Sequence, residues 1–99
     1  MILIHGFGAT GLIYVKLIDF LRREFRLTTI DLLGMGGSGR PKFDLTSSRD
    51  CIQFFVLSIE AYMRRQDQIE FMRENKKNSE KVILMGHSLG AFLSVLYAL

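Results

Sequence analysis

The sequence predicts an α/β fold, because three short apolar runs each lead into a glycine-rich turn. The runs cover residues 1–4, 27–30 and 81–85, and stretches with the apolar spacing of a helix separate them. Strands and helices that alternate in this order form a parallel sheet with crossover helices. A length of 99 residues suits one domain, so we expect a single α/β domain over residues 1–99.

Helices are expected in three places. The first is predicted over residues 11–25, where five apolar residues recur on one face: Tyr14, Leu17, Ile18, Leu21 and Phe25. A second helix should begin after Ser47, a suitable N-cap, and its apolar face runs to Met63. The polar stretch 64–80 is expected to be a frayed helix end and a loop. From Leu89 the chain is apolar nearly all round, which predicts a buried helix.

Composition argues against several classes of function. The net charge is only +3, and the basic residues are scattered among acids, which does not predict a nucleic-acid surface. Cys51 is the only cysteine, so there is no internal disulfide. Residues 82–99 lack charged side chains, but Gly86 and Gly90 interrupt them, and we expect no membrane-spanning helix. No signal peptide is recognisable, which favours an intracellular location, in the cytoplasm or at a lipid surface.

The first glycine cluster allows a nucleotide-binding interpretation. Gly6, Gly8 and Gly11 spell G-x-G-x-x-G between a predicted strand and a predicted helix, and Asp31 lies twenty residues further on. This arrangement is the dinucleotide-binding fingerprint of a Rossmann domain. The same spelling recurs in the loop 34–39, just ahead of a proline, so a glycine-rich turn satisfies the pattern easily.

The last glycine cluster predicts a serine nucleophile. Gly86-His87-Ser88-Leu89-Gly90 has the form G-x-S-x-G and lies between a predicted strand and a predicted helix, which is the setting of a nucleophile elbow. The sharp turn would strain Ser88 and leave no room for side chains at Gly86 and Gly90. It would also place the Ser88 hydroxyl at the positive N-terminus of the helix, with the N–H of Leu89 directed at a developing oxyanion.

A second oxyanion donor is expected from the loop after the first strand. His5-Gly6-Phe7-Gly8 occupies that place, and its glycines allow the backbone to approach a substrate closely. We assign the second donor to the N–H of Phe7. His5 is interpreted as a hydrogen-bonded core histidine, and Asp31 as a cap of the turn that follows it. This interpretation accounts for both glycine motifs, whereas nucleotide binding leaves the last one unexplained.

Together these motifs resemble the α/β-hydrolase superfamily. The resemblance rests on residues 5–8, on 31–41 with its Asp-Leu-Leu-Gly and Gly-Arg-Pro, and on 82–93 around the serine, and it covers essentially the whole chain. The spelling is most similar to a lipid-directed branch that includes lysophospholipases acting on N-acyl phospholipids and a coactivator of triglyceride lipase linked to phosphatidic acid synthesis. The resemblance implies a partial α/β-hydrolase fold, whose three parallel strands correspond to the third, fourth and fifth of the full sheet, the first of them in the middle.

The resemblance also implies roles for single residues. Ser88 would be the nucleophile, and Phe7 and Leu89 the oxyanion donors. In this family the triad acid and histidine follow the serine; neither follows Ser88, so they are not in this chain, and we expect an inactive fragment by itself. The expected partners are a small-molecule or lipid ester and a membrane surface or lipid droplet, with no nucleic acid, metal or cofactor. A non-catalytic coactivator with the same fold is an alternative function for this chain. A dinucleotide-binding Rossmann domain is a weaker alternative.

Overall fold

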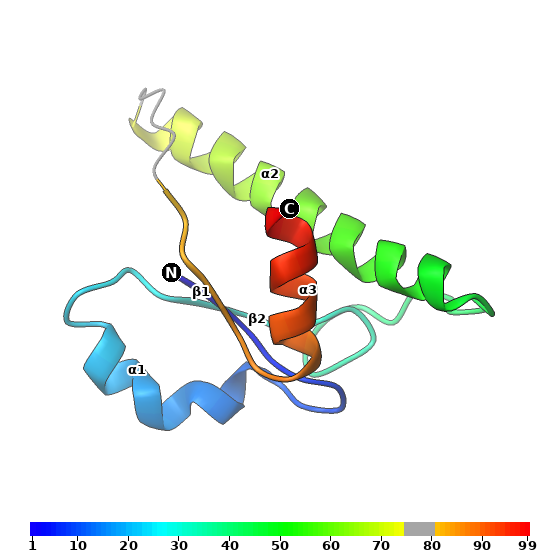
Figure 1. Ribbon diagram of the computed structural model, residues 1–99. Helices are drawn as coiled ribbons and strands as arrows, with labels where there is room; N and C mark the ends of the chain where they lie inside the picture. The colour runs from blue at the N-terminus through cyan, green and yellow to red at the C-terminus, as the bar shows by residue number, and fades with distance from the viewer. Residues whose placement is uncertain (75–80) are drawn as a thin grey trace.

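The computed structural model describes residues 1–74 and 81–99 and contains one parallel sheet with helices packed against it (Figure 1). The strands are β1 (Ile2–Ile4), β2 (Thr28–Ile30) and β3 (Leu84–Gly86), in the order β2-β1-β3. Both neighbours of β1 run parallel to it. The predicted α/β class, the parallel sheet and the central position of the first strand are therefore confirmed.

The register of the sheet brings the glycine-rich segments to one edge. Ile4, the last residue of β1, pairs with Ile30 on one side and with Gly86 on the other. All three strands therefore end at the same edge, and the segments that follow them meet there. Ligands of open parallel sheets bind at this carboxyl edge, so the register favours a site built from all three segments.

The predicted first helix is divided in the structure. A 3-10 turn, η1 (Gly11–Tyr14), leads directly into the helix α1 (Val15–Leu21). Thr10 caps η1, because its hydroxyl accepts the N–H of Leu12 at 3.2 Å. The α-helix ends earlier than predicted, because the N–H groups of Arg23 and Glu24 bond to carbonyls three residues back, which tightens this segment into turns.

The second helix, α2 (Ser48–Glu74), is longer than predicted. Ser47 caps its start as expected, since its hydroxyl accepts a backbone N–H at 3.2 Å. The predicted fraying from Arg64 is wrong, because this residue pairs with Glu60 one turn earlier at 2.7 Å and the helix continues. The loss of the apolar stripe therefore does not mark the end of the helix; in residues 64–68 most side chains are exposed. The predicted loop at 75–80 lies outside the described residues.

Helices α2 and α3 (Leu89–Ala98) pack on the sheet and enclose the main core with it. The buried members of this core are Ile2, Ile4, Leu32, Ile59, Met63 and Leu93. The prediction of a buried last helix is confirmed in part: Gly90, Leu93 and Ser94 of α3 are buried, whereas Phe92 and Val95 stay 49% and 59% exposed. No helix in the described part of the chain has the length and apolar character that crossing a membrane requires.

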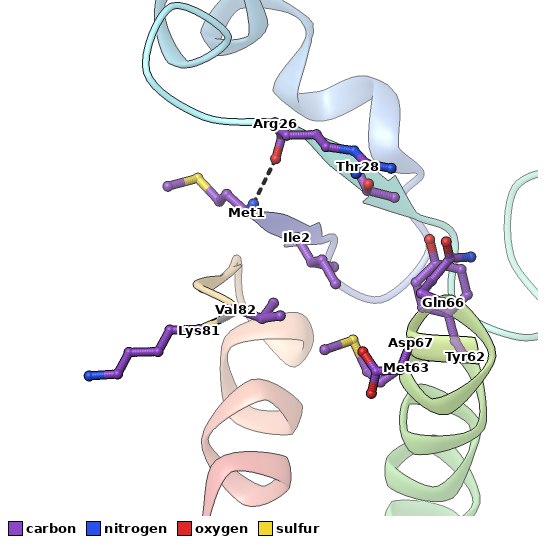
Figure 2. A pocket seen from close by; sticks show the side chains of 10 residues that line it. All are labelled: Met1, Ile2, Arg26, Thr28, Tyr62, Met63, Gln66, Asp67, Lys81 and Val82. Atoms are coloured by element: carbon purple, nitrogen blue, oxygen red, sulfur yellow. Dashed lines mark hydrogen bonds between the residues drawn. The ribbon is translucent and has the colours of Figure 1, made fainter. Parts of the chain in front are cut away.

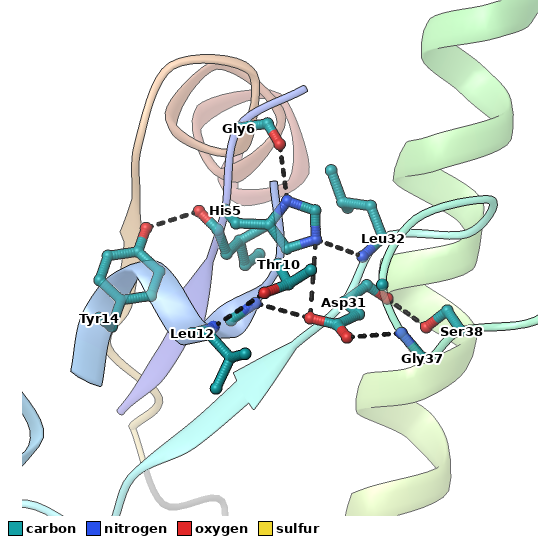
Figure 3. Close-up of polar contacts among 12 residues, drawn as sticks. His5, Gly6, Thr10, Leu12, Tyr14, Asp31, Leu32, Gly37 and Ser38 are labelled. Atoms are coloured by element: carbon teal, nitrogen blue, oxygen red, sulfur yellow. Dashed lines mark hydrogen bonds and ion pairs between the residues drawn. The ribbon is translucent and has the colours of Figure 1, made fainter. Parts of the chain in front are cut away.

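A buried histidine links the segments that follow β1 and β2 (Figure 3). His5 is fully buried; its Nδ1 lies 2.6 Å from the carbonyl oxygen of Gly6, and its Nε2 lies 3.0 Å from the backbone nitrogen of Leu32. Because a backbone N–H can only donate, Nε2 is the acceptor and Nδ1 carries the proton. The interpretation of His5 as a hydrogen-bonded core histidine is therefore confirmed.

Asp31 ties together two further segments beside this histidine (Figure 3). Its carboxylate accepts the backbone N–H of Gly37 at 2.9 Å and that of Gly11 at 2.6 Å. These two bonds, the one to Gly37 most, lower the pKa of the Asp31 carboxyl. The predicted cap of the turn directly after Asp31 is wrong, because the N–H of Leu32 is bound by His5 and the carboxylate reaches more distant glycines instead.

Replacing Asp31 by asparagine should destabilise the fold, because an amide cannot accept both N–H groups as a carboxylate does. We expect the free energy of unfolding to fall by about 1–2 kcal/mol at neutral pH. Since the folded-state pKa is lowered, the carboxylate stabilises the fold above its ordinary pKa of 3.8, and this stabilisation is lost as the pH falls through the lowered value. Urea unfolding of both proteins from neutral to acid pH measures the difference.

Asp44→Asn is the matched control, because Asp44 is exposed and forms a surface ion pair with Lys42. This control should change the free energy of unfolding by less than about 0.5 kcal/mol. Equal losses in the two variants would contradict the role of Asp31, as would a loss from Asp31→Asn that is the same at acid and at neutral pH.

Candidate active site

Ser88 lies at the junction of β3 and α3, in a conformation that is unusual for a residue with a side chain. Its φ is 52° and its ψ is −119°, and it is the one non-glycine residue with a positive φ among those the structure describes. Such a conformation costs about 1–3 kcal/mol and persists only where the surrounding structure enforces it. Ser88 is exposed to solvent and precedes the first turn of α3.

Gly86 and Gly90 enforce this turn, because neither position has room for a side chain. A Cβ on Gly86 would overlap the backbone of Gly90 and Ala91, and a Cβ on Gly90 would overlap the carbonyl group of Ile4. The start of α3 therefore lies in direct backbone contact with the end of β1. As the sequence predicted, neither Gly86 nor Gly90 has room for a side chain.

The carbonyl oxygen of Ile4 attaches this turn to the central strand. It accepts the N–H of His87 at 3.1 Å and the hydroxyl of Tyr14 at 2.8 Å. Burial raises the pKa of Tyr14, so its hydroxyl keeps the proton that it donates. The central strand, η1 and the serine turn thus meet at one oxygen atom.

The loop after β1 lies against Ser88. A Cβ placed on Gly6 would be 3.1 Å from the Cβ of Ser88 and 3.2 Å from Nδ1 of His87. The side chain of Phe7, the next residue, is exposed. The structure therefore brings together the two segments, 5–8 and the serine turn, that the sequence predicted to share a site.

Two backbone N–H groups in these segments are available to a ligand. Within residues 1–74 and 81–99, neither the N–H of Phe7 nor that of Leu89 donates a hydrogen bond. Leu89 is the first residue of α3, where the helix dipole adds partial positive charge. Backbone N–H groups of this kind can bind an anionic oxygen.

A base for Ser88 is missing from the described part of the chain. Ser88 makes no hydrogen bond to a histidine or a carboxylate there. Both ring nitrogens of His5 and both carboxylate oxygens of Asp31 are engaged by backbone groups. No acidic residue and no histidine follows Ser88 in the sequence.

The structure does not favour the nucleotide-binding interpretation. In a dinucleotide site, the acidic residue after the second strand would bind the ribose. Here the oxygens of Asp31 already accept the N–H groups of Gly11 and Gly37. Among the residues that the structure describes, no group of His, Cys, Asp and Glu is arranged to hold a metal ion.

An apolar cavity of about 400 Å³ lies beside the loop after β1. We call it the aromatic pocket; it is lined by Phe7, Gly8, Leu33, Gly34, Met35, Pro41, Phe43, Phe54 and Phe55. The sequence did not predict this pocket, because most of its wall comes from the segment between β2 and α2 and from the start of α2, and no motif connects these two. The recurrence of phenylalanine in these two segments was the one available signal.

A smaller pocket, of about 130 Å³, lies at the opposite edge of the sheet (Figure 2). Met1, Ile2 and Thr28, at the starts of β1 and β2, line it together with Tyr62 of α2. The amino group of Met1 donates to the carbonyl oxygen of Arg26 at 2.7 Å beside it. None of the predicted site residues borders this pocket.

Known proteins resemble the chain over its whole length. It is 33% identical over 99 residues to a probable 1-acylglycerol-3-phosphate O-acyltransferase of Oryza sativa subsp. japonica, and 36% identical over 101 residues to a (lyso)-N-acylphosphatidylethanolamine lipase of Bos taurus. These alignments cover all of the chain but 21% and 25% of the two relatives, so the chain spans about a fifth to a quarter of their length. No solved structure gives a significant match.

A protein-family comparison agrees with the fold and with the resemblance of the motifs. The family model described as alpha/beta hydrolase fold matches residues 1–99. The three parallel strands and flanking helices fit a part of that fold. The chain therefore belongs to the alpha/beta hydrolase fold family.

Proposed function

We propose that this chain carries the nucleophile and the oxyanion site of an enzyme that transfers acyl groups of lipid esters, with Ser88 as the nucleophile. The observation that carries the proposal is the strained turn at Ser88, set against the Gly6 loop. The relatives named as a lipase and as an acyltransferase support an acyl group of a lipid as the transferred group. Hydrolysis and transfer share their first half, in which the serine takes the acyl group.

The proposed reaction begins when Oγ of Ser88 attacks the carbonyl carbon of the ester and gives up its proton to a base. The tetrahedral oxyanion then collapses, the ester C–O bond breaks, and the alcohol leaves with a proton from the protonated base. Water can attack the resulting acyl-serine and release a fatty acid. If the hydroxyl of a second lipid attacks instead, the acyl group is transferred to it, and Ser88 is restored in both cases.

The N–H groups of Phe7 and Leu89 are the proposed oxyanion donors. His5 holds the loop of Phe7 through the Gly6 carbonyl, and the Ile4 carbonyl holds the turn before Leu89. The donors are therefore in place before the substrate arrives, which is the condition for strong electrostatic catalysis. Removing one such donor from an enzyme costs about 2.7–4 kcal/mol of transition-state stabilisation.

The base is the part of the machinery that the described residues do not supply. A serine hydroxyl without a base is a weak nucleophile, so we expect the 99-residue chain to react slowly. In the proposal, a triad acid and histidine belong to the whole protein rather than to this segment. A lipid ester resides in a membrane or a droplet, so the whole protein would work at such a surface.

Labelling with a fluorophosphonate, which phosphonylates activated serines with loss of fluoride, tests the nucleophile. We expect slow labelling of the chain at Ser88, accelerated by added imidazole because the small base replaces the missing one. The Ser88→Ala variant should not be labelled with or without imidazole. Mass spectrometry of the labelled peptide identifies the modified residue.

Ser48→Ala is the matched control, because Ser48 is also exposed and lies away from the site, at the start of α2. Labelling of this variant should equal that of the parent. If imidazole produces no label on Ser88, or if Ser88→Ala is labelled as fast as the parent, the proposal is wrong and the non-catalytic alternative gains support.

A methyl group at Gly6 should slow this labelling. The added Cβ in Gly6→Ala would lie 3.1 Å from the Cβ of Ser88, so the loop or the serine must shift by a few tenths of an ångström. We expect the imidazole-assisted rate to fall at least about tenfold, a fraction of the loss for a whole oxyanion donor. In Gly39→Ala the new Cβ meets no neighbour, and the rate should not change. Similar rates for the two variants, both folded by circular dichroism, would contradict this arrangement.

A further inference from the structure

The aromatic pocket opens beside the proposed reaction centre. A Cβ on Gly6 would lie 3.1 Å from the Cβ of Ser88, so the two residues are close, and the next two residues, Phe7 and Gly8, line the pocket. An ester bound with its carbonyl at Ser88 therefore has this cavity within reach on one side. At about 400 Å³, the pocket falls in the range of cavities that hold small-molecule ligands.

The walls of the pocket are suited to a hydrocarbon. All of its lining residues are apolar or glycine, and none is charged. Phe43, Phe54 and Phe55 contact one another, with ring centroids 5.2–6.0 Å apart, and form one continuous wall. Such a surface binds methylene groups, whereas a phosphate or an ammonium group placed there would lose its hydration with no partner.

Phe43 shows how the wall is assembled. It belongs to the irregular segment between β2 and α2, yet its ring packs edge-on against Phe54 of α2 at a centroid distance of 5.2 Å. Phe43 is 50% exposed and lines the pocket, so part of its apolar surface is open to a ligand. Lys42 and Asp44, on either side of Phe43, point their charges into solvent and pair with each other at 2.9 Å.

We infer that the aromatic pocket binds the acyl chain of the ester substrate and leaves the headgroup outside. This inference rests on the proposed function for the position of the ester carbonyl. It further assigns the selection of the substrate to the segment from Leu33 to Phe43 and to the first turns of α2. The length of the acyl chain, rather than the nature of the headgroup, is then what this part of the protein recognises.

The test is the binding of straight-chain fatty acids, from hexanoate to hexadecanoate, measured by displacement of a fluorescent fatty acid below micelle-forming concentrations. Each methylene that enters the pocket should strengthen binding roughly fourfold, until the cavity is full and the affinity levels off. Glycerol phosphate, a headgroup without a chain, should displace nothing. Affinity that is independent of chain length, or displacement by glycerol phosphate, would overturn the inference.

Phe43→Asp and Phe92→Asp form a matched pair of variants. The two phenylalanines are equally exposed, at 50% and 49%, but Phe92 lies on α3 and does not line the pocket. Phe43→Asp should weaken the binding of dodecanoate at least about tenfold, because it places a carboxylate in an apolar wall. Phe92→Asp should leave it unchanged. Equal losses would mean that the fatty acid adsorbs to apolar surface in general, and the inference would be wrong.

Two further variants separate this inference from the proposed function. Leu33→Trp fills the cavity and should lower the chain length at which the affinity levels off, whereas Leu57→Trp, exposed on α2, should not. Ser88→Ala should bind dodecanoate like the parent even though it loses fluorophosphonate labelling. In the parent chain, length-dependent binding without labelling of Ser88 would refute the nucleophile alone, and labelling without length-dependent binding would refute the pocket alone.

Discussion

The backbone contact between the end of β1 and the start of α3 is the constraint on which the site depends. Gly90 has no side chain, so the helix can reach the Ile4 carbonyl, and that carbonyl also binds the N–H of His87 and the hydroxyl of Tyr14. An oxygen that accepts two hydrogen bonds cannot move without breaking them, and the Tyr14 hydroxyl is buried and would be left unpaired. The position of Ser88 relative to the loop after β1 is therefore set by the sheet and not by flexible side chains.

A second group of polar contacts, made by His5 and Asp31, keeps the neighbouring segments in place. The ring nitrogens and carboxylate oxygens of these two side chains are all engaged in those contacts. His5 and Asp31 bind backbone groups of Gly6, Leu32, Gly11 and Gly37. Within the described residues, no buried side-chain nitrogen or oxygen lacks a partner. These two ionisable groups, which a sequence motif presents as candidates for chemistry, therefore serve as connectors in this fold.

How far the sequence predicted the structure depended on whether the signal was local. The strands and the glycines around Ser88 were predictable, because apolar runs and tight turns leave their mark within a few residues. The length of α2 was not predictable, since the sequence after Met63 lacks an apolar stripe, although the pair of Arg64 with Glu60 supports the helix there. The aromatic pocket was not predictable either, because Phe43 and Phe54 meet only through tertiary packing. The roles of Phe7 and Leu89 remain predictions.

The central place of the first strand also determines when the site can assemble. β1 is made before β2, α2 and β3, so β3 can pair with it only across all of the chain that lies between them. Contacts between residues so far apart in sequence form slowly, because a long loop must close before they contribute stability. Until β3 pairs with β1, one edge of β1 therefore has no partner strand. Nothing holds Ser88 in its strained turn until that pairing forms. The strained conformation of Ser88 is thus gained only after β3 pairs with β1.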